Sequence, residues 1–298
     1  MFKGILKWLG VLLLLLQGVS AWSSPLSEVP FQLRSGLIWI RVDGPSGAKP
    51  LNFILDSGAE ASVLDVETAR RLDVELGPPM TVRGINATTS GYWPEHLSVR
   101  MGGIALPTNY LAMDLSALSA ACHRHVDGLI GADFFVGRVV QIDFFRDKIR
   151  LLENCTPGAA AQVLPLQIEG SRLRVPVEVM GLGKDWARLD TGCASALHWA
   201  VSPTALPDES SSQEFGVGVS SMLIQQHTKS VRLGNLTLRN ISTGLHTEKL
   251  LDGEAGLLGA GLLSQFGTVT IDASAGQLVL ECPCSHKLSS PKFSSERR

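Results

Sequence analysis

The sequence has little charge of either sign and no excess of basic residues. Charged residues make up 18% of the 298 positions, and the formal net charge is −2. Proteins that bind nucleic acid or an anionic membrane surface usually carry a basic patch, so neither partner is expected. The chain is 45% apolar and contains 30 glycines. This composition argues against extensive disorder and is typical of a turn-rich globular protein of one or two domains.

The chain also lacks an apolar run that is long enough to cross a bilayer. The run WLGVLLLLLQGV follows Lys3 and Lys7 and precedes Val19-Ser20-Ala21; a spanning helix needs roughly 20 apolar residues. Basic residues, a short apolar segment and small residues in this order predict a secretory signal peptide over residues 1–21. We therefore expect an exported protein, periplasmic or extracellular, without a membrane span in the mature chain. Whether the segment is cleaved or kept as an anchor stays open.

Cysteine and histidine show no standard zinc-binding spacing. The two short clusters, CHRH and CPCSH, do not have the spacing of known zinc sites, so no metal is expected, and we expect no cofactor. Disulfides are commoner in exported proteins, but the number of cysteines is odd. We interpret Cys193 as a buried thiol. The pairing of the other four stays open: Cys122, Cys155, Cys282 and Cys284.

The clearest positive signal is an internal repeat. FILDSGAEASVL, which contains Asp56, is followed in the second half by ARLDTGCASAL, which contains Asp190. LSVRMGGIAL is followed by KSVRLGNLTL, and DGLIGADFF by AGLLGAGLL, in the same order. Three blocks that recur in order indicate a duplicated chain. We predict two homologous lobes, residues 22–153 and 164–284, joined by a linker over 154–163, with a disordered tail over 285–298.

Each half has the pattern of an all-β domain. RSGLIWIRVDG and SRLRVPVEVMG alternate apolar and polar residues and end in glycine, as half-buried strands do. The segments 139–152 and 268–280 each predict two strands around a turn. Asp143 and Asp272 occupy equivalent places in these hairpins, and we interpret them as structural. The clearest helical signal is VETARRLDVEL, Val66 to Leu76.

A duplicated Asp-(Ser/Thr)-Gly has a chemical use. If the two lobes are related by approximate two-fold symmetry, Asp56 and Asp190 face each other at the axis. Two adjacent carboxylates cannot easily ionise together, so one proton is shared between them. The ionised member can then act as a general base on water, while the protonated member polarises a carbonyl. We expect Ser57 and Thr191 to hydrogen-bond across the axis, and Gly58 and Gly192 to permit a close approach of the backbone.

These residues resemble the aspartic proteases, of the retroviral type and the pepsin type. The matching motifs are Asp56-Ser57-Gly58-Ala59 and Asp190-Thr191-Gly192, each followed by two apolar residues and a glycine. The resemblance covers nearly the whole mature chain and implies two retropepsin-like β-barrel lobes with the active site between them. It implies a monomeric endopeptidase for polypeptide substrates, most active at acidic pH. It also implies that four residues of the later blocks support the catalytic loops: Ile130, Gly131, Leu258 and Gly259.

The resemblance further implies a β-hairpin flap that closes over the substrate. The flap should lie in MTVRGINATTSGYW with its tip between Gly84 and Gly91, and its candidate substrate contacts are Gly84, Ile85, Asn86 and Tyr92. An ordinary glycine-bounded hairpin has the same pattern. The alternative function is a catalytically silent protein of the cell envelope that uses the same two lobes to bind a peptide or a protein.

Overall fold

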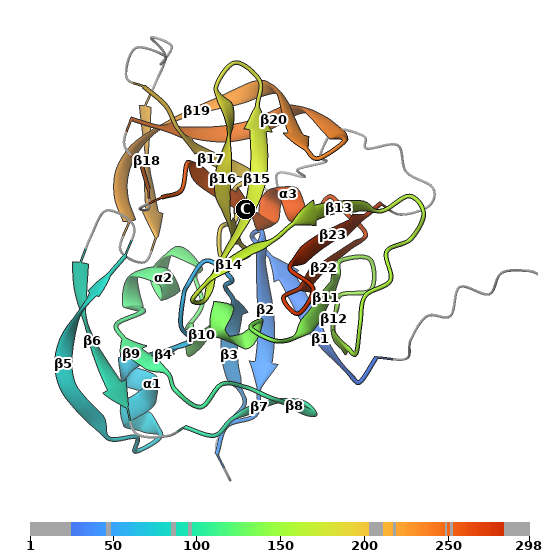
Figure 1. Ribbon diagram of the computed structural model, residues 1–298. Helices are drawn as coiled ribbons and strands as arrows, with labels where there is room; N and C mark the ends of the chain where they lie inside the picture. The colour runs from blue at the N-terminus through green and yellow to red at the C-terminus, as the bar shows by residue number, and fades with distance from the viewer. Residues whose placement is uncertain are drawn as a thin grey trace, which may run out of the picture.

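The computed structural model (Figure 1) is built mainly from β-strands, with only short helices. The all-β class predicted from the sequence is confirmed. The predicted signal peptide, the predicted tail from residue 285 and Cys284 lie outside the described residues. The described residues are 25–45, 49–84, 88–94, 97–202, 211–216, 219–247, 249–250 and 253–282.

The largest sheet has thirteen strands, in the order β13-β23-β22-β11-β12-β1-β2-β3-β10-β4-β9-β6-β5. Most of its strands come from the first half of the chain. In chain order they are β1 (Ser27–Arg34), β2 (Leu37–Val42), β3 (Leu51–Leu55), β4 (Val63–Asp65), β5 (Leu76–Arg83), β6 (Thr88–Pro94), β9 (Leu111–Met113), β10 (Gly128–Ile130), β11 (Val139–Asp143), β12 (Lys148–Leu152), β13 (Gln162–Pro165), β22 (Thr268–Asp272) and β23 (Gln277–Glu281).

The second sheet has eight strands from the second half, in the order β14-β15-β16-β21-β17-β20-β19-β18. An additional pairing of β15 with β19 closes six of these strands into a barrel. The strands are β14 (Gln167–Glu169), β15 (Arg172–Val179), β16 (Gly183–Asp190), β17 (Leu197–Ala200), β18 (Ser211–Gly216), β19 (Val219–Leu233), β20 (Leu236–His246) and β21 (Gly256–Gly259).

The remaining elements are small. A two-stranded ribbon pairs β7 (Arg100–Met101) with β8 (Ile104–Ala105). The helices are α1 (Val66–Arg71), α2 (Ser116–Ala121), the 3-10 turn η1 (Ala132–Phe134) and α3 (Ala260–Leu263). None of the helices among the described residues combines the length and the apolar character needed to span a membrane.

The two predicted lobes contribute strands to the same sheet. The hairpins predicted over 139–152 and 268–280 are present as β11–β12 and β22–β23, and β11 pairs with β22 in antiparallel register. β13, which takes its first two residues from the predicted linker, adds to the edge at β23. In Figure 1 these strands lie at the right, with barrel strands β15, β16, β17, β19 and β20 above and β3 to β6 at the lower left. The division into lobes and their two-fold symmetry stay predictions.

One continuous apolar core supports both halves. It includes Phe53 and Leu55 of β3 together with Leu189 of β16 and Leu258 of β21, all 0% exposed. Each buried Leu or Phe side chain stabilises the fold by about 1.5–3 kcal/mol relative to an exposed one. A second cluster around Trp39 lies on the opposite face of β2 and β3, because alternate residues of a strand point to opposite faces.

The helix predicted over Val66 to Leu76 is shorter than expected. α1 ends at Arg71, and Asp73 takes a left-handed conformation with φ 54°. Leu76 already belongs to β5, where it pairs with Pro94. Strand pairing therefore takes the last residue of the apolar pattern that predicted the helix. The N-terminal end was correctly placed because Asp65 caps it, accepting a hydrogen bond from the Thr68 N–H.

Candidate active site

Asp56 and Asp190 both stand at the ends of buried strands. Asp56 directly follows β3, and its N–H donates to the Ile130 carbonyl of β10, 2.8 Å away. Asp190 is the last residue of β16 and pairs with Gly259 of β21. β3 runs parallel to β10, and β16 runs parallel to β21. Each carboxylate therefore stands at the end of a strand that is hydrogen-bonded to a second strand, and this pairing limits the movement of the Asp loop.

Four hydrogen bonds tie the two Asp loops together. The Ser57 N–H donates to Thr191 Oγ1 (2.9 Å), and the Thr191 N–H donates to Ser57 Oγ (3.0 Å). The Ser57 hydroxyl donates to the Leu189 carbonyl and the Thr191 hydroxyl to the Leu55 carbonyl, each at 2.8 Å. These are the contacts between the two Asp loops that the sequence predicts. Both hydroxyls are at most 1% exposed, so water cannot replace a lost partner at low cost.

The two glycines bring the carboxylates together. A Cβ atom on Gly58 would lie 2.4 Å from Cγ of Asp190, and one on Gly192 would lie 2.4 Å from Cγ of Asp56. No larger residue fits at either position. The Gly58 N–H donates to Asp56 Oδ1 (3.0 Å) and the Gly192 N–H donates to Asp190 Oδ1 (2.9 Å). Each carboxyl group is therefore oriented by the amide of one glycine and lies against the glycine of the other loop.

The two carboxyl groups titrate as a pair. Burial raises the pKa of both, and the charge of Asp56 raises the pKa of Asp190 further. Hydrogen bonding between the two side chains acts in opposite directions, lowering the pKa of Asp56 and raising the pKa of Asp190. Asp190 is only 8% exposed, which makes its ionised form the costlier of the two. The arrangement favours one shared proton, held mainly on Asp190, beside an ionised Asp56.

Comparison with known proteins agrees with this geometry. Residues 39–134 match the model of the aspartyl protease family. The resemblance predicted from the sequence is confirmed for this segment, which contains Asp56 and Ile130-Gly131 and ends before Asp190. No curated protein matches the chain. The family match supports protease activity, and hence a hydrolase.

The later apolar-apolar-Gly blocks lie beside the Asp loops in both halves of the chain. Ile130 pairs with Leu55, and Leu258 pairs with Leu189. A Cβ on Gly131 would lie 2.4 Å from the Ala61 carbonyl carbon. On Gly259 it would lie 2.1 Å from the Ser195 oxygen. The blocks therefore contact the Asp loops directly, and their glycines allow that approach.

A buried ion pair beside the Asp loops was not predicted. Arg188 Nε lies 2.9 Å from Glu254 Oε2, and its Nη2 lies 2.9 Å from Oε1. The remaining nitrogen, Nη1, donates to the Gly58 carbonyl at 3.0 Å. Arg188 and Glu254 are 5% and 1% exposed. The charge of Arg188 lowers the pKa of both Asp56 and Asp190, against the larger effect of burial.

The repeat concealed this pair because it directs attention to residues that the halves share. The position in the first half that corresponds to Arg188 is Ile54. Arg188 lies two positions before Asp190 in an otherwise apolar stretch. Comparing the positions at which the two halves differ could have identified it, because a charged residue is rarely buried without a partner.

The proposed flap region is a hairpin in the structure. β5 pairs with β6, and the turn between them begins at Gly84; Ile85 and Asn86 lie outside the described residues. The turn falls between Gly84 and Gly91, the predicted bounds, and Gly91 itself belongs to β6, where it pairs with Met80. Tyr92 is half-buried and pairs with Pro79. The predicted buried thiol, Cys193, is also only half-buried.

No disulfide joins the cysteines among the described residues. Cys122 and Cys155 are half-buried, and Cys282 is exposed. Burial raises the pKa of all three thiols, which keeps them protonated and lowers their nucleophilicity.

Proposed function

We propose that this protein is an aspartic endopeptidase in which Asp56 and Asp190 activate a water molecule to hydrolyse a peptide bond. The observation that carries the proposal is the placement of each carboxyl group against the glycine of the opposite loop, 2.4 Å from a hypothetical Cβ. Two carboxyl groups held this close can share one proton, and the family match over residues 39–134 supports the same reaction class.

The two carboxyl groups take different roles in the proposed reaction. Asp56, ionised, removes a proton from the water, whose oxygen attacks the carbonyl carbon of the substrate. Asp190 donates its proton to the carbonyl oxygen, so that a neutral gem-diol forms. In the second step the C–N bond breaks, Asp56 passes its proton to the leaving nitrogen, and a hydroxyl proton of the gem-diol returns to Asp190. All protons are thereby returned, and the site is ready for another cycle.

Arg188 positions the pair in this mechanism. It holds the Gly58 carbonyl, and Gly58 in turn lies against Asp190. Its positive charge keeps part of the pair ionised despite burial. Without that charge, both carboxyl groups would hold their protons to higher pH.

We also propose that the substrate is an extended polypeptide bound between the two halves and covered by the β5–β6 hairpin. Extended peptides bind through main-chain hydrogen bonds, with pockets for alternate side chains. Because one chain supplies both carboxyl groups, we propose an active monomer. The N-terminal sequence supports an exported protein, periplasmic or extracellular.

Cleavage of a mixed peptide library, read by mass spectrometry between about pH 3 and about pH 8, tests the proposed function. We expect cleavage that is greatest at acidic pH and that is blocked by a peptide in which a statine-type hydroxyl group mimics the gem-diol. Cleavage that the mimic does not inhibit, or that rises steadily above neutral pH, would contradict the proposal. An absence of cleavage at every pH would favour the peptide-binding alternative.

A further inference from the structure

A second set of charged residues gathers on one face of the β1–β2 hairpin. Gln32 pairs with Trp39, and Arg34 pairs with Leu37. Arg41 stands two residues after Trp39 in β2, so it projects to the same face. The opposite face of this hairpin packs into the main core through Phe31, Ile38 and Ile40. The exposed arginines therefore stand on a rigid support, with Trp39 between them.

The end of α2 covers this face. His123 has φ 49° and donates to the Ala120 carbonyl, while the Arg124 N–H donates to Ser119. This pair of bonds is the Schellman arrangement that reverses the chain after a helix. The reversal brings the Arg124 guanidinium over the Trp39 ring, 4.9 Å from its centroid, and Arg124 also donates to Asn52 Oδ1.

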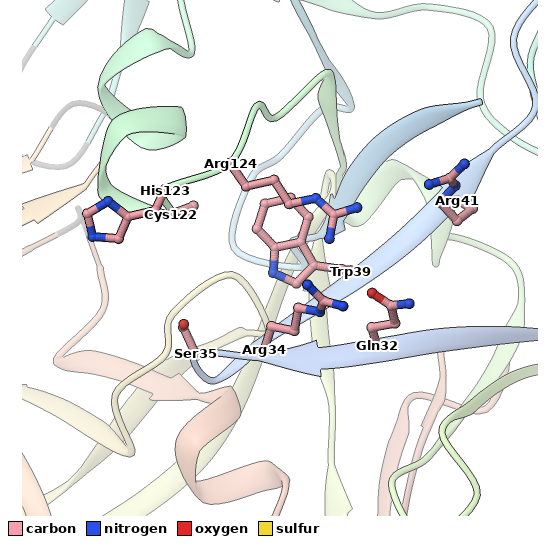
Figure 2. Close-up of a pocket in the computed structure, with 8 residues that line it drawn as sticks. All are labelled: Gln32, Arg34, Ser35, Trp39, Arg41, Cys122, His123 and Arg124. Carbon is pink, nitrogen blue, oxygen red and sulfur yellow. The ribbon is translucent and has the colours of Figure 1, made fainter. Parts of the chain in front are cut away.

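Together these elements line an open surface pocket of about 590 Å³, which we call the arginine pocket. Figure 2 shows Arg34, Arg41 and Arg124 around Trp39, with Ser35 and His123 on the other side. No carboxylate lines it, and none of its three arginines forms an ion pair with another residue in the described part of the chain. Its lining residues are Gln32, Arg34, Ser35, Trp39, Arg41, Cys122, His123 and Arg124.

The arginine pocket adjoins both Asp loops. The turn after Ser35 contacts the second loop: a Cβ on Gly36 would lie 3.0 Å from Cβ of Ala194, four residues beyond Asp190. On the other side, Trp39 pairs with Ile54, two residues before Asp56. A peptide that lies between the halves would therefore pass close to the arginine pocket.

We propose that the arginine pocket binds an acidic side chain of the polypeptide substrate, at a fixed number of residues from the cleaved bond. This inference rests on the proposed function. Guanidinium groups bind carboxylates through paired hydrogen bonds, and three of them without an internal carboxylate leave donors for an incoming anion. The arginine pocket thus favours substrates that carry a negative charge, because no carboxylate of the chain itself lines it.

Direct binding tests the pocket without requiring cleavage. The full chain carrying Asp190→Asn is titrated into a fluorescein-labelled octamer of glutamate with an amidated C-terminus, and anisotropy is recorded at about pH 6, where the peptide carboxyls are ionised. We expect binding about tenfold tighter than for the amidated octamer of glutamine, and a loss of that preference in the Arg34→Gln, Arg41→Gln double variant. Arg239→Gln, an exposed arginine of β20, is the matched control and should keep it. Equal binding of the two amidated peptides would overturn the proposal. A glutamine octamer with a free C-terminal carboxylate is a further control: if it binds tightly while the amidated glutamate octamer does not, the proposal is also overturned.

The cleavage profile then tests whether the pocket belongs to the substrate site. In the peptide library at about pH 5, wild type and Arg239→Gln should enrich Asp or Glu at one distance from the cut, and the double variant should lose this enrichment while still cutting. Unchanged profiles in the double variant would overturn the proposal but leave the proposed function intact. A chain that binds the acidic octamer but cuts nothing would contradict the proposed function instead.

Discussion

At the scale of single residues, the two halves of the site share their Asp-loop hydrogen bonds but differ in the charged residues beside them. Ser57 and Thr191 exchange equivalent hydrogen bonds, but Arg188 stands where the first half has Ile54. The repeat predicted the Asp, Ser, Thr and Gly residues because each has a partner in the other half. It could not predict Arg188 or Glu254, which act through an ion pair that forms only in the folded chain.

Replacing Arg188 by Met should change both stability and pH dependence. Glu254 would stay buried without a charge partner, which costs about 3–5 kcal/mol of the free energy of unfolding. The pKa values of Asp56 and Asp190 should rise, since the charge of Arg188 lowers both. A base with a raised pKa ionises at higher pH, so both limbs of the pH–rate profile should move to higher pH.

A double variant separates the two effects of Arg188. Arg188→Met with Glu254→Leu removes the unpaired carboxylate and should recover most of the stability in denaturant titrations. Its pH–rate profile should remain displaced, because the lost charge is not restored. Recovery of the wild-type profile together with the stability would mean that Arg188 has only a structural role.

Thr191 offers a second test at this scale. Thr191→Val removes the hydroxyl that accepts from the Ser57 N–H and donates to the Leu55 carbonyl. Leaving these buried groups unpaired should lower the free energy of unfolding by about 1–3 kcal/mol, measured by denaturant titration. We expect kcat to fall more than KM rises, and Thr191→Ser to retain both. Equal kinetic effects of Val and Ser would count against the role of the hydroxyl.

At the scale of elements, the sequence predicted the hairpins but not which strands pair with their edges. The β11–β12 and β22–β23 hairpins follow from alternation and a turn, both of which are local. The pairing of β11 with β22 joins segments more than a hundred residues apart, and alternation does not say which edges meet. The arginine pocket escaped prediction for the same reason, since β1, β2 and the end of α2 meet only in the fold.

Asp143 at the end of β11 tests the electrostatics of this shared sheet. It is 0% exposed, and its carboxylate accepts from Arg146 Nη1 at 3.1 Å and from Arg150 Nη1 at 2.6 Å. Burial alone would raise its pKa, but the hydrogen bonds and charge of these arginines outweigh burial and lower it. The ionised form is therefore stabilised by folding, a contribution present above the unfolded pKa and lost as pH falls through the folded pKa.

Asp143→Asn should consequently destabilise the chain by about 2 kcal/mol near neutral pH, as for a hydrogen bond to a charged group. The difference from wild type should shrink as the pH is lowered below about 4, where the wild-type carboxylate takes up its proton. Denaturant titrations of both proteins at a series of pH values measure it. A difference that does not depend on pH would show that the charge of Asp143 contributes nothing.

At the scale of the whole molecule, one chain supplies both Asp loops. The alternation within each half was enough to predict the all-β class, and the repeated blocks were enough to predict the meeting of Asp56 with Asp190. Neither predicted that the halves share a sheet of thirteen strands and one core, because these depend on long-range packing.

The proposed active monomer can be tested directly. We expect light scattering to give the mass of a single chain, no more than the 31.9 kDa of the full sequence. The activity per molecule should stay constant as the protein is diluted about a thousandfold, since no association step is needed. Activity per molecule that falls on dilution would instead indicate that a second chain completes the site.

The central claim is that Asp56 and Asp190 form one catalytic pair, and the most direct measurement is the rate of cleavage of a single library-derived peptide by Asp56→Asn and by Asp190→Asn. Each substitution keeps the shape of the side chain and removes its acid–base function. We predict that each variant alone loses at least about a thousandfold in kcat, and that the double variant loses hardly more, because residues that act as a unit are not additive. Retention of cleavage within about tenfold of wild type by either single variant would contradict the account, since such a small loss means that its carboxyl group is dispensable.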